Sequence, residues 1–541
     1  MFASINGVRI FFDIEGSGYV PDGAYMRHRP VCFAIHGGPG SDHADFKPWL
    51  TPLAEHMQIV YMDLRCNGQS ERVDPATCTL EQLTDDIEAL RQYLGFDKIS
   101  LMGHSFGGMV AQVYATRYAE SLDRLVLVCT APSHEFYPAA LKFAERIGTP
   151  EQLKVIPELF EGRIQDDEHL VRWWDICYDL YFHTHDELLM WETGNRPIGS
   201  LEVANYTFKH FIPHYDVRSQ LSSLQVPTLI VGADYDWITP LSQSEEMHSL
   251  IPDSRLVVFH ESGHMPFIEE HQDFIDELTD FLIRLPQHEA WRQERLQSVT
   301  DFQGDLALIA LHSITEPMSI SGIPGQWAPL GADQPGLTLT ASASDNLTVD
   351  GQAIDGTIAL EADVTIVRIS DALTAVATTQ PGSNHLLSIY DANADAIHGF
   401  KGIDSFEYDR KWVIKGKFVK GDNNRTMAFA HVDDAQGNLR YHQSPGDISF
   451  IIEDKTYAFT PFLSSGSLVV IYGDQSNGKS TYGLGRMLVV TPDKEGGVVL
   501  DFNRSFLPPC AFSPHFNCPF PPAQNRLPFE VTAGEKQVIE E

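Results

Sequence analysis

The pentapeptide GHSFG at residues 103–107 decides the fold of the first half of this chain. It follows an apolar run at 99–102 and precedes a small, apolar segment at 107–113, a pattern that predicts a strand, a sharp turn and a helix. In a GxSxG motif the turn holds a serine hydroxyl clear of the strand end, and the two glycines allow a strained backbone. Ser105 is therefore a candidate nucleophile.

Two polar residues follow Ser105, each just after another apolar run. Asp236 lies in GADYDWITP (232–240), and His264 lies in ESGHMPF (261–267). Ser, Asp, His is the chain order of the catalytic triad in α/β-hydrolases. In such a triad the serine attacks a carbonyl carbon, the histidine accepts and returns its proton, and the aspartate orients the imidazole. The sequence thus predicts Ser105, Asp236 and His264 as catalytic residues.

A glycine-rich stretch, HGGPG at 36–40, ends a further apolar run upstream. The α/β-hydrolase fold places one oxyanion-hole amide at this position, and glycines let the loop approach the substrate closely. The second amide comes from the residue after the nucleophile. We therefore expect the backbone amides of Gly38 and Phe106 to form the oxyanion hole.

Strand and helix patterns alternate over the first 130 residues. An opening hairpin is expected at 2–14, strands at 31–35, 59–64 and 125–129, and an amphipathic helix at 79–94. This alternation implies a doubly wound, mostly parallel sheet with helices on both faces. The expected fold of residues 1–285 is thus the α/β-hydrolase fold.

Residues 132–218 differ from this alternation because they form helical segments rich in aromatic side chains. Their position between two expected strands is where α/β-hydrolases carry a lid, so a cap over the site is expected. Most of these aromatic residues should fill the cap's own core, and a minority should line a pocket. They are Phe160, Trp173, Trp174, Tyr178, Tyr181, Phe182, Trp191, Tyr206, Phe208 and Phe211.

The length of the chain predicts more than one domain. A sequence of 541 residues is too long for one hydrophobic core. After residue 285, QHEAWRQERLQ at 287–297 is rich in helix formers and predicts a helical connector over 286–300 that docks the two halves. Short β-type runs separated by Gly, Asp, Asn and Pro then predict an all-β barrel or sandwich domain over 301–541.

Composition limits the partners and the compartment. A formal charge of −36 argues against nucleic acid and anionic membranes as partners. The N-terminus lacks a signal-peptide pattern, and no run of residues is apolar for long enough to span a membrane. The seven cysteines are scattered, which does not indicate a disulfide framework. We expect a cytoplasmic protein with a small-molecule or short-peptide substrate; its oligomeric state is open, with a homodimer as one possibility.

Several motifs of the first half together resemble the proline-iminopeptidase-like branch of α/β-hydrolases: HGGPG, YMDLRCNGQS (61–70), the GxSxG turn, VGADYDWITP and SGHMPFIE. The DxxxP turn of that family favours Asp236 over Asp234. The resemblance implies an aminopeptidase or amidase that recognises a free α-ammonium with acidic cap residues, for which Glu192, after Trp191, is the best local match. A carboxylesterase or lactonase is the alternative, because GHSFGG is also used by esterases and the family's usual elbow is GGSWG-like.

The C-terminal half resembles an uncharacterised bacterial family of unknown function, through FEYDRKW (406–412), the run at 466–486, LDFNRSFLPPCAF (500–512) and CPFPPAQNRLP (518–528). This resemblance implies no activity, and a binding or assembly module is a further alternative. Its most site-like polar residues are Arg486, Asp501, Asn503, Asn525 and Glu535. Buried ion pairs and turn caps explain these residues at least as well.

Three other patterns imitate ligand sites, and no cofactor or metal is expected. GDQSNGKS at 473–480 matches a P-loop formally, but a β-type run follows it where a P-loop needs a helix, so a hairpin loop is expected. His183, His185 and Asp186 lack the further ligands of a hydrolytic metal site. Cys510, His515 and Cys518 offer too few soft ligands and are expected to be packed in a Pro-braced loop.

Overall fold

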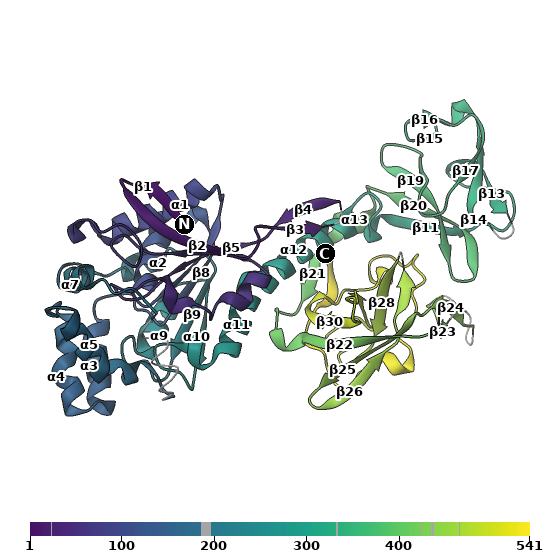
Figure 1. Cartoon of the computed structure of the whole chain (residues 1–541). Coiled ribbons are helices and arrows are strands. Elements are labelled where there is room, and N and C mark those ends of the chain that lie inside the picture. Colours follow the sequence, from purple (N-terminus) through teal and green to yellow (C-terminus); the bar gives the residue numbers. More distant parts are fainter. Residues whose placement is uncertain are drawn as a thin grey trace. The chain divides into compact units, whose positions relative to one another are not determined.

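The computed structural model describes residues 1–22, 24–184, 196–331, 334–422, 425–432, 434, 438–464 and 466–540. Contacts between residues divide the chain into two compact units, Met1–Pro286 and Gln287–Glu541. Each unit has its own sheets and its own buried apolar side chains. Figure 1 shows the elements of both units with their labels.

An eight-stranded sheet forms the centre of the first unit, in the order β1-β2-β6-β5-β7-β8-β9-β10. From β6 to β10 the neighbouring strands are parallel, whereas β1 and β2 are antiparallel and form one edge. This arrangement confirms the mostly parallel, doubly wound sheet that the sequence predicts. The strands are β1 (Phe2–Ile5), β2 (Val8–Glu15), β5 (Val31–Ile35), β6 (Gln58–Met62), β7 (Ile99–His104), β8 (Leu122–Val128), β9 (Thr228–Ala233) and β10 (Ser254–Phe259); β3 (Tyr19–Asp22) and β4 (Tyr25–His28) form a separate hairpin.

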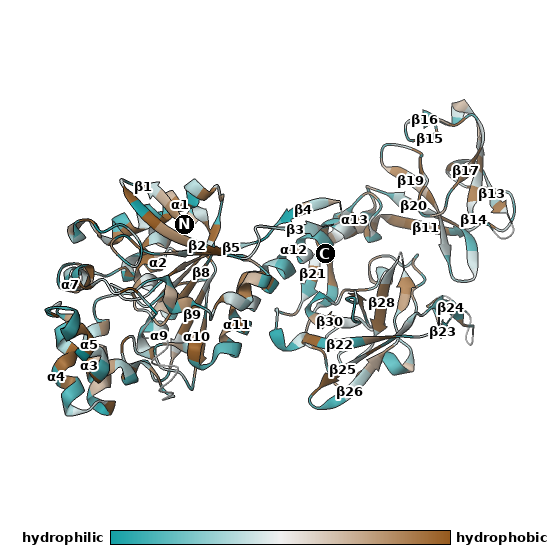
Figure 2. Cartoon of the chain, in the orientation of Figure 1, coloured by the Kyte–Doolittle hydropathy of each residue, from teal (hydrophilic) through white to brown (hydrophobic). Residues whose placement is uncertain are grey.

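The strand order reverses between β5 and β7. From β5 the chain moves to β6 on one side and then crosses to β7 on the other. Ligands of open α/β sheets bind beyond the carboxyl ends of the strands at such a point. HGGPG follows β5 and GHSFG spans the end of β7, so both motifs lie at this point. The central strands are buried and apolar, as the brown strands of the first unit in Figure 2 show.

Helices connect the parallel strands, and α1 and α2 pack against each other. Thr79 caps α1 by accepting a hydrogen bond from the N–H of Gln82 at 3.2 Å. A π-helical turn at Asp280–Arg284 leads without a break into α12. The helices are α1 (Leu80–Leu94), α2 (Phe106–Arg117), α9 (Leu241–Leu250), α10 (Pro266–Glu269), α11 (His271–Thr279) and α12 (Leu285–Thr300).

The described part of the segment between β8 and β9 is largely helical, as its sequence predicts. Its helices are α3 (Phe136–Ile147), α4 (Pro150–Phe160), α5 (Asp167–Cys177), η5 (Tyr178–Tyr181), α7 (Leu201–His210), η6 (Ile212–His214) and α8 (Arg218–Leu221). Aromatic rings join this cap to the sheet unit: Phe160 and Tyr181 both pack edge-on against Trp237, which follows β9. Trp173 is buried within the cap and donates its indole N–H to the carbonyl of Val155 at 2.9 Å.

The second unit is rich in antiparallel strands, which form several small sheets; its described residues contain two larger apolar cores and two smaller apolar clusters. Residues 308–391 enclose Trp327, Leu339 and Leu387. Their strands are β11 (Leu308–Ser313), β12 (Met318–Ile320), β13 (Ile323–Gly331), β14 (Gln334–Ala341), β15 (Thr348–Val349), β16 (Gln352–Ala353), β17 (Gly356–Leu360), β18 (Ile366–Arg368), β19 (Leu373–Gln380) and β20 (Ser383–Asp391). The sequence indicates one β-rich region here and does not separate these two cores.

The other core contains Tyr472, Leu500 and Phe502. Its region carries β21 (Phe400–Ser405), β22 (Val413–Lys420), β23 (Thr426–Phe429), β24 (Arg440–Gln443), β25 (Gly446–Ile452), β26 (Lys455–Phe459), β27 (Phe462–Ser464), β28 (Ser467–Tyr472), β29 (Arg486–Val490), β30 (Gly497–Asp501) and β31 (Glu535–Glu540), with the short helix α13 (Asp395–Gly399) before it. Among the described residues of both units, no helix is both long enough and apolar enough to cross a bilayer.

Candidate active site

Ser105 lies at the turn between β7 and α2, with φ 54° and ψ −119°. A side chain other than glycine is strained at positive φ, and surrounding contacts hold the turn in place. The N–H of Ser105 donates to the carbonyl of Val128 at 2.9 Å, and the hydroxyl of Thr130 donates to the carbonyl of Ser105 at 2.7 Å.

The two glycines of the motif are required by close backbone packing. A Cβ on Gly103 would lie 2.2 Å from the carbonyl oxygen of Gly107, and a Cβ on Gly107 would lie 2.2 Å from that of Ile35. Both separations are far below van der Waals contact, so larger residues would move the turn. The sequence pattern GxSxG thus fixes the geometry that presents Ser105.

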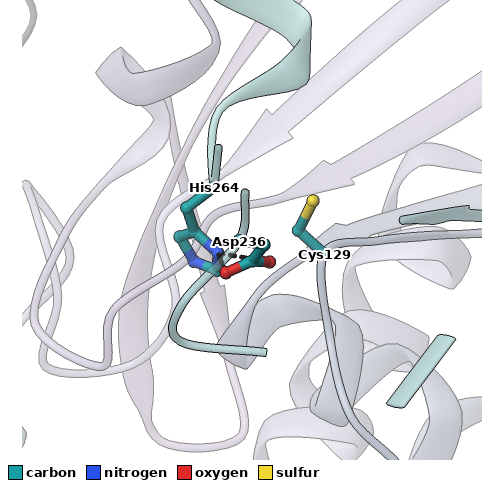
Figure 3. A group of neighbouring side chains, drawn as sticks. All are labelled: Cys129, Asp236 and His264. Carbon is teal, nitrogen blue, oxygen red and sulfur yellow. Dashed lines mark hydrogen bonds and ion pairs between the residues drawn. The ribbon is translucent and has the colours of Figure 1, made fainter. Parts of the chain in front are cut away.

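Asp236 and His264 form a buried pair (Figure 3). The Nδ1 atom of His264 lies 2.9 Å from Oδ2 and 3.0 Å from Oδ1 of Asp236. The carboxylate also accepts hydrogen bonds from the N–H of Ile238 at 2.9 Å, and from the N–H and hydroxyl of Thr239 at 3.0 and 2.8 Å. Burial alone would raise the pKa of Asp236, but His264 and these donors hold that pKa below its ordinary value.

The structure brings Asp236, and not Asp234, to His264. Asp234 turns outward and contacts His260 instead, with 2.8 Å between Oδ2 and Nδ1. Ser105 and His264 line one cavity together. The three residues that the sequence predicts as a triad therefore lie beyond the carboxyl ends of β7, β9 and β10.

The loop that carries His264 is held from three sides. The N–H of His264 donates to the carbonyl oxygen of Tyr181 in the cap at 2.7 Å. Glu269 accepts hydrogen bonds from Gly263, from His183 at 2.7 Å and from Thr184 at 2.8 Å. His104 Nε2 lies 2.9 Å from the carbonyl oxygen of His264, and burial together with His264 lowers the pKa of His104 to about 3. The neutral His104 ring can therefore donate to this loop.

Gly38 and Phe106 are the residues whose backbone amides the sequence predicts as the oxyanion hole. Both residues line the cavity beside Ser105, and Phe106 begins α2, so the helix ladder does not use its N–H. His36 stabilises the HGGPG loop by accepting a hydrogen bond from the N–H of Leu64 at 3.1 Å. The side chain of Asn67 accepts one from the N–H of Gly40 at 2.8 Å.

The cavity next to Ser105 has a volume of about 730 Å³, within the range of small-molecule sites. One part of its lining is apolar and comes from the cap, including Leu159, Phe160 and Phe208. Among the described residues that line it, no Lys or Arg is present, whereas three carboxyl groups are: Asp45, Asp175 and Asp179. The cavity is therefore electrostatically suited to a neutral or cationic ligand.

Asp45 is the carboxyl group on the same loop as Gly38. Its Oδ2 accepts a hydrogen bond from the hydroxyl of Ser41 at 2.6 Å. Burial raises the pKa of Asp45 to about 7, although the Ser41 hydrogen bond acts in the opposite direction. This carboxyl group therefore changes charge near neutral pH.

Two predicted substrate-binding residues, Trp191 and Glu192, lie outside the described residues, as do His185 and Asp186. His183 is described: its ring stacks on Tyr235 with 3.5 Å between ring centres, and its Nε2 lies 3.2 Å from a carboxylate oxygen of Glu261.

Two groups of three metal-ligand side chains lie close together in the described part of the chain: Cys129, Asp236 and His264, and Asp42, His43 and Asp63. In both, hydrogen bonds already engage the carboxylates. Asp63 accepts from the N–H and Nδ1 of His43 at 2.9 and 2.7 Å, and Asp42 accepts from the N–H of Ile198 at 2.9 Å. These bonds brace the HGGPG loop and tie it to the cap, which explains the second group without a metal.

Cys510, His515 and Cys518 do not form such a group. The N–H of Cys510 donates to the sulfur of Cys518 at 3.3 Å, whereas the N–H of His515 donates to Ser513. The stretch at 473–480 lies in the connection between the antiparallel strands β28 and β29, and no helix follows it. Both observations match the expected packed thiols and hairpin loop.

The polar residues singled out in the second unit bond to the unit's own backbone and side chains. Arg486 is buried and donates to Asp474 at 2.6 Å and to the carbonyl of Val531 at 2.8 Å. Asn525 bonds to the backbone of Thr460 and Ile471, and Glu535 accepts from Leu507. Asn503 bonds to Asp501 and to the backbone of Asp409. These contacts match the expected buried ion pairs and turn caps.

Sequence reasoning missed several residues that hold the site together, namely Asn67, Cys129, Tyr181 and Glu269. Asn67 and Glu269 did carry a signal, since they lie within the motifs YMDLRCNGQS and SGHMPFIE. The others act through contacts between segments that are distant in sequence, and no local pattern marks them.

Comparison with known families agrees with this geometry. Residues 30–271 match the family described as alpha/beta hydrolase fold, and residues 398–536 match a protein family of unknown function, DUF1684. The segment at 308–391, with its separate core, lies outside both matches.

Similar proteins cover the first half of the chain. A proline iminopeptidase of Pestalotiopsis fici is 28% identical over 288 residues, which are 52% of this chain and 98% of the relative. One of Saccharolobus solfataricus is 29% identical over 272 residues, 46% of this chain and 83% of the relative. A solved alpha/beta fold family hydrolase of Bacillus anthracis is 24% identical with a TM-score of 0.44, covering 52% of this chain and 98% of that one. The family match over residues 30–271 shows that the N-terminal half of this chain has the alpha/beta hydrolase fold, and the chain is a hydrolase similar to proline iminopeptidases over that half.

Proposed function

We propose that this chain is a serine hydrolase that cleaves an amide or ester bond of a small substrate through an acyl-enzyme. The observation that carries the proposal is the buried Asp236–His264 pair beside Ser105, which lies at a strained strand-to-helix turn. In this mechanism the hydroxyl oxygen of Ser105 attacks the carbonyl carbon while Nε2 of His264 takes its proton. Asp236 keeps the proton on Nδ1, so that Nε2 is free to act as the base.

The negative charge that develops on the carbonyl oxygen is met by the N–H groups of Gly38 and Phe106. Each such donor is worth about 3 kcal/mol in the transition state. His264 then passes its proton to the leaving nitrogen or oxygen, the carbon–heteroatom bond breaks, and Ser105 carries the acyl group. A water molecule, activated by His264, releases the acid and restores the serine.

Within this class we propose an aminopeptidase or amidase of the proline-iminopeptidase type, acting on a substrate with a free amine. The acidic lining of the cavity supports this choice, since Asp45 can pair with an ammonium group close to Ser105. Trp174 and Tyr178 line the same cavity, and aromatic faces also attract cations. Similarity to proline iminopeptidases points the same way.

A carboxylesterase or lactonase is the second candidate. The apolar cap side chains in the cavity, among them Leu159 and Phe208, suit a neutral acyl group as well. For the second unit we propose a binding or assembly role, because its conspicuous polar residues are engaged in internal hydrogen bonds and ion pairs.

A substrate panel tests the choice between the two enzymes. Amino-acid arylamides with a free amine, the same arylamides with a blocked amine, and p-nitrophenyl esters are offered to the full chain and to Ser105→Ala. We expect the highest kcat/KM for free amines and no turnover by Ser105→Ala. Equal or better turnover of blocked substrates and esters would replace the aminopeptidase with the esterase, and full activity of Ser105→Ala would refute the serine mechanism.

A further inference from the structure

Cys129 lies close to Asp236, the acid of the proposed triad, although the proposed mechanism gives Cys129 no role. It directly follows β8 and has φ 43°, a left-handed conformation that favours glycine. Its side chain is fully buried. The sulfur, an oxygen of Asp236 and a ring nitrogen of His264 all lie within 4.8 Å of one another. Figure 3 shows the three side chains. Cys129 directly follows β8, and Asp236 and His264 lie in the loops after β9 and β10.

The chemistry of this contact is that of a neutral donor beside a buried anion. Burial, and then the charge and hydrogen bonding of Asp236, raise the pKa of the Cys129 thiol well above its ordinary value. The sulfur therefore keeps its proton and is no nucleophile. Ile238 and Thr239 donate to the carboxylate from its own turn, whereas Cys129 approaches it from a neighbouring strand.

We propose that Cys129 is a positioning residue for Asp236. The thiol donates its S–H to the Asp236 carboxylate, keeps the carboxylate facing His264 and stabilises its negative charge. This inference rests on the proposed function. The carboxylate governs how strongly His264 holds a proton, so any group that stabilises the carboxylate lowers the basicity of His264. Loss of the thiol should therefore move the acid limb of the pH profile of kcat/KM upward.

Asp45 lines the same cavity and changes charge near pH 7, so each variant is compared both in the unchanged chain and together with Asp45→Asn. The titratable groups packed against the pair itself do not obscure the effect near neutral pH. His104, from β7, packs 4.8 Å from His264 between ring centres and stays neutral because its pKa is lowered to about 3. Tyr181, from the cap, has its pKa raised well above 10 by burial. Burial raises the pKa of Glu269, in α10, although hydrogen bonds from three backbone N–H groups act in the opposite direction. Glu269 and these donors are the same in every variant that is compared.

The test compares the pH dependence of kcat/KM in the full chain and three variants of Cys129. Cys129→Ala and Cys129→Gly remove the donor, and glycine also suits the left-handed backbone if alanine folds poorly. Cys129→Ser keeps a donor at the same position. The matched control is Cys32→Ala, which removes another buried thiol from the same sheet, in β5. Asp236→Asn tests whether the Asp236–His264 pair is needed for hydrolysis.

We expect Cys129→Ala and Cys129→Gly to move the acid limb of the profile upward by about half a pH unit or more, since a hydrogen bond to a charged group is worth roughly one pKa unit. Cys129→Ser should restore the limb, and Cys32→Ala should leave it in place. The low-field proton resonance of the His264 Nδ1–H should shift in the alanine and glycine variants and return in the serine variant.

Two results would overturn the role of the thiol. In one, the alanine and glycine variants keep the acid limb and the proton resonance of the unchanged chain. In the other, the serine variant moves them as far as alanine does, which would mean that only packing is involved. If instead Asp236→Asn hydrolyses substrate at full rate, the proposed function itself falls, and this outcome is distinct from both.

Discussion

Replacing Asp236 by asparagine should nearly abolish hydrolysis while leaving the fold in place. The carboxylate accepts hydrogen bonds from Ile238, Thr239 and His264. If the amide oxygen of the asparagine keeps the backbone donors, its NH2 group faces Nδ1 of His264 and must donate to it. The imidazole proton then moves to Nε2, where it blocks removal of the proton from Ser105.

The size of this effect follows from the role of the pair. The same exchange in a serine protease triad lowers kcat by about 10⁴-fold, which corresponds to about 5.4 kcal/mol in the activation barrier. Asp234→Asn is the matched control, because Asp234 lies two residues away and contacts the exposed His260 instead of His264. We expect that variant to keep kcat within about threefold, since exposed ion pairs contribute little.

The assay is steady-state hydrolysis of the preferred substrate by the full chain and both variants, with thermal melting as the control for folding. Melting temperatures close to that of the unchanged chain would show that the loss is chemical. Equal losses in the two variants, or a larger loss in Asp234→Asn, would refute the assignment of Asp236 as the partner of His264.

Three further predictions concern the cavity, the second unit and the division of the chain. Because the pKa of Asp45 is raised to about 7, its carboxylate is lost as the pH falls through that value; KM for a free-amine substrate should rise there, and Asp45→Asn should abolish this pH dependence. Arg486→Met leaves Asp474 buried without its partner and should destabilise the second unit by about 3–5 kcal/mol, measured by denaturant unfolding; a loss below 1 kcal/mol would contradict this. A chain that ends at Pro286 should still react with an active-site serine probe, because the proposed triad and oxyanion hole lie within Met1–Pro286; a folded but unreactive fragment would assign part of the site to the second unit.

Local patterns predicted the elements that present the candidate site. GHSFG and HGGPG each lie at the end of a buried parallel strand. An apolar run that ends in a glycine turn can be recognised in the sequence without knowledge of the segments that pack against it. The choice of Asp236 over Asp234 came from the family's turn and agrees with the contact that His264 makes. The sequence alone offered no physical reason for this choice, because what separates the two carboxylates is the direction in which their side chains point in the folded chain.

Contacts between distant segments could not be predicted in this way. Cys129 looks like any strand-end cysteine until β8 and β9 are placed side by side, and Tyr181 acts through its carbonyl, which every residue has. In the second half, short strands pair with strands far along the chain, such as β11 with β20. The sequence pattern therefore indicates one β-rich region and does not separate the two larger cores of the structure. The π-helical turn at Asp280–Arg284, which leads into α12, also has no local pattern that predicts it.

The proposed nucleophile can be tested directly by mass spectrometry of the full chain after reaction with a fluorophosphonate. We expect one added group, on the peptide that contains Ser105, and none in Ser105→Ala at an unchanged melting temperature. Labelling of a different serine, or undiminished labelling of Ser105→Ala, would contradict the central claim that this hydrolase acts through Ser105.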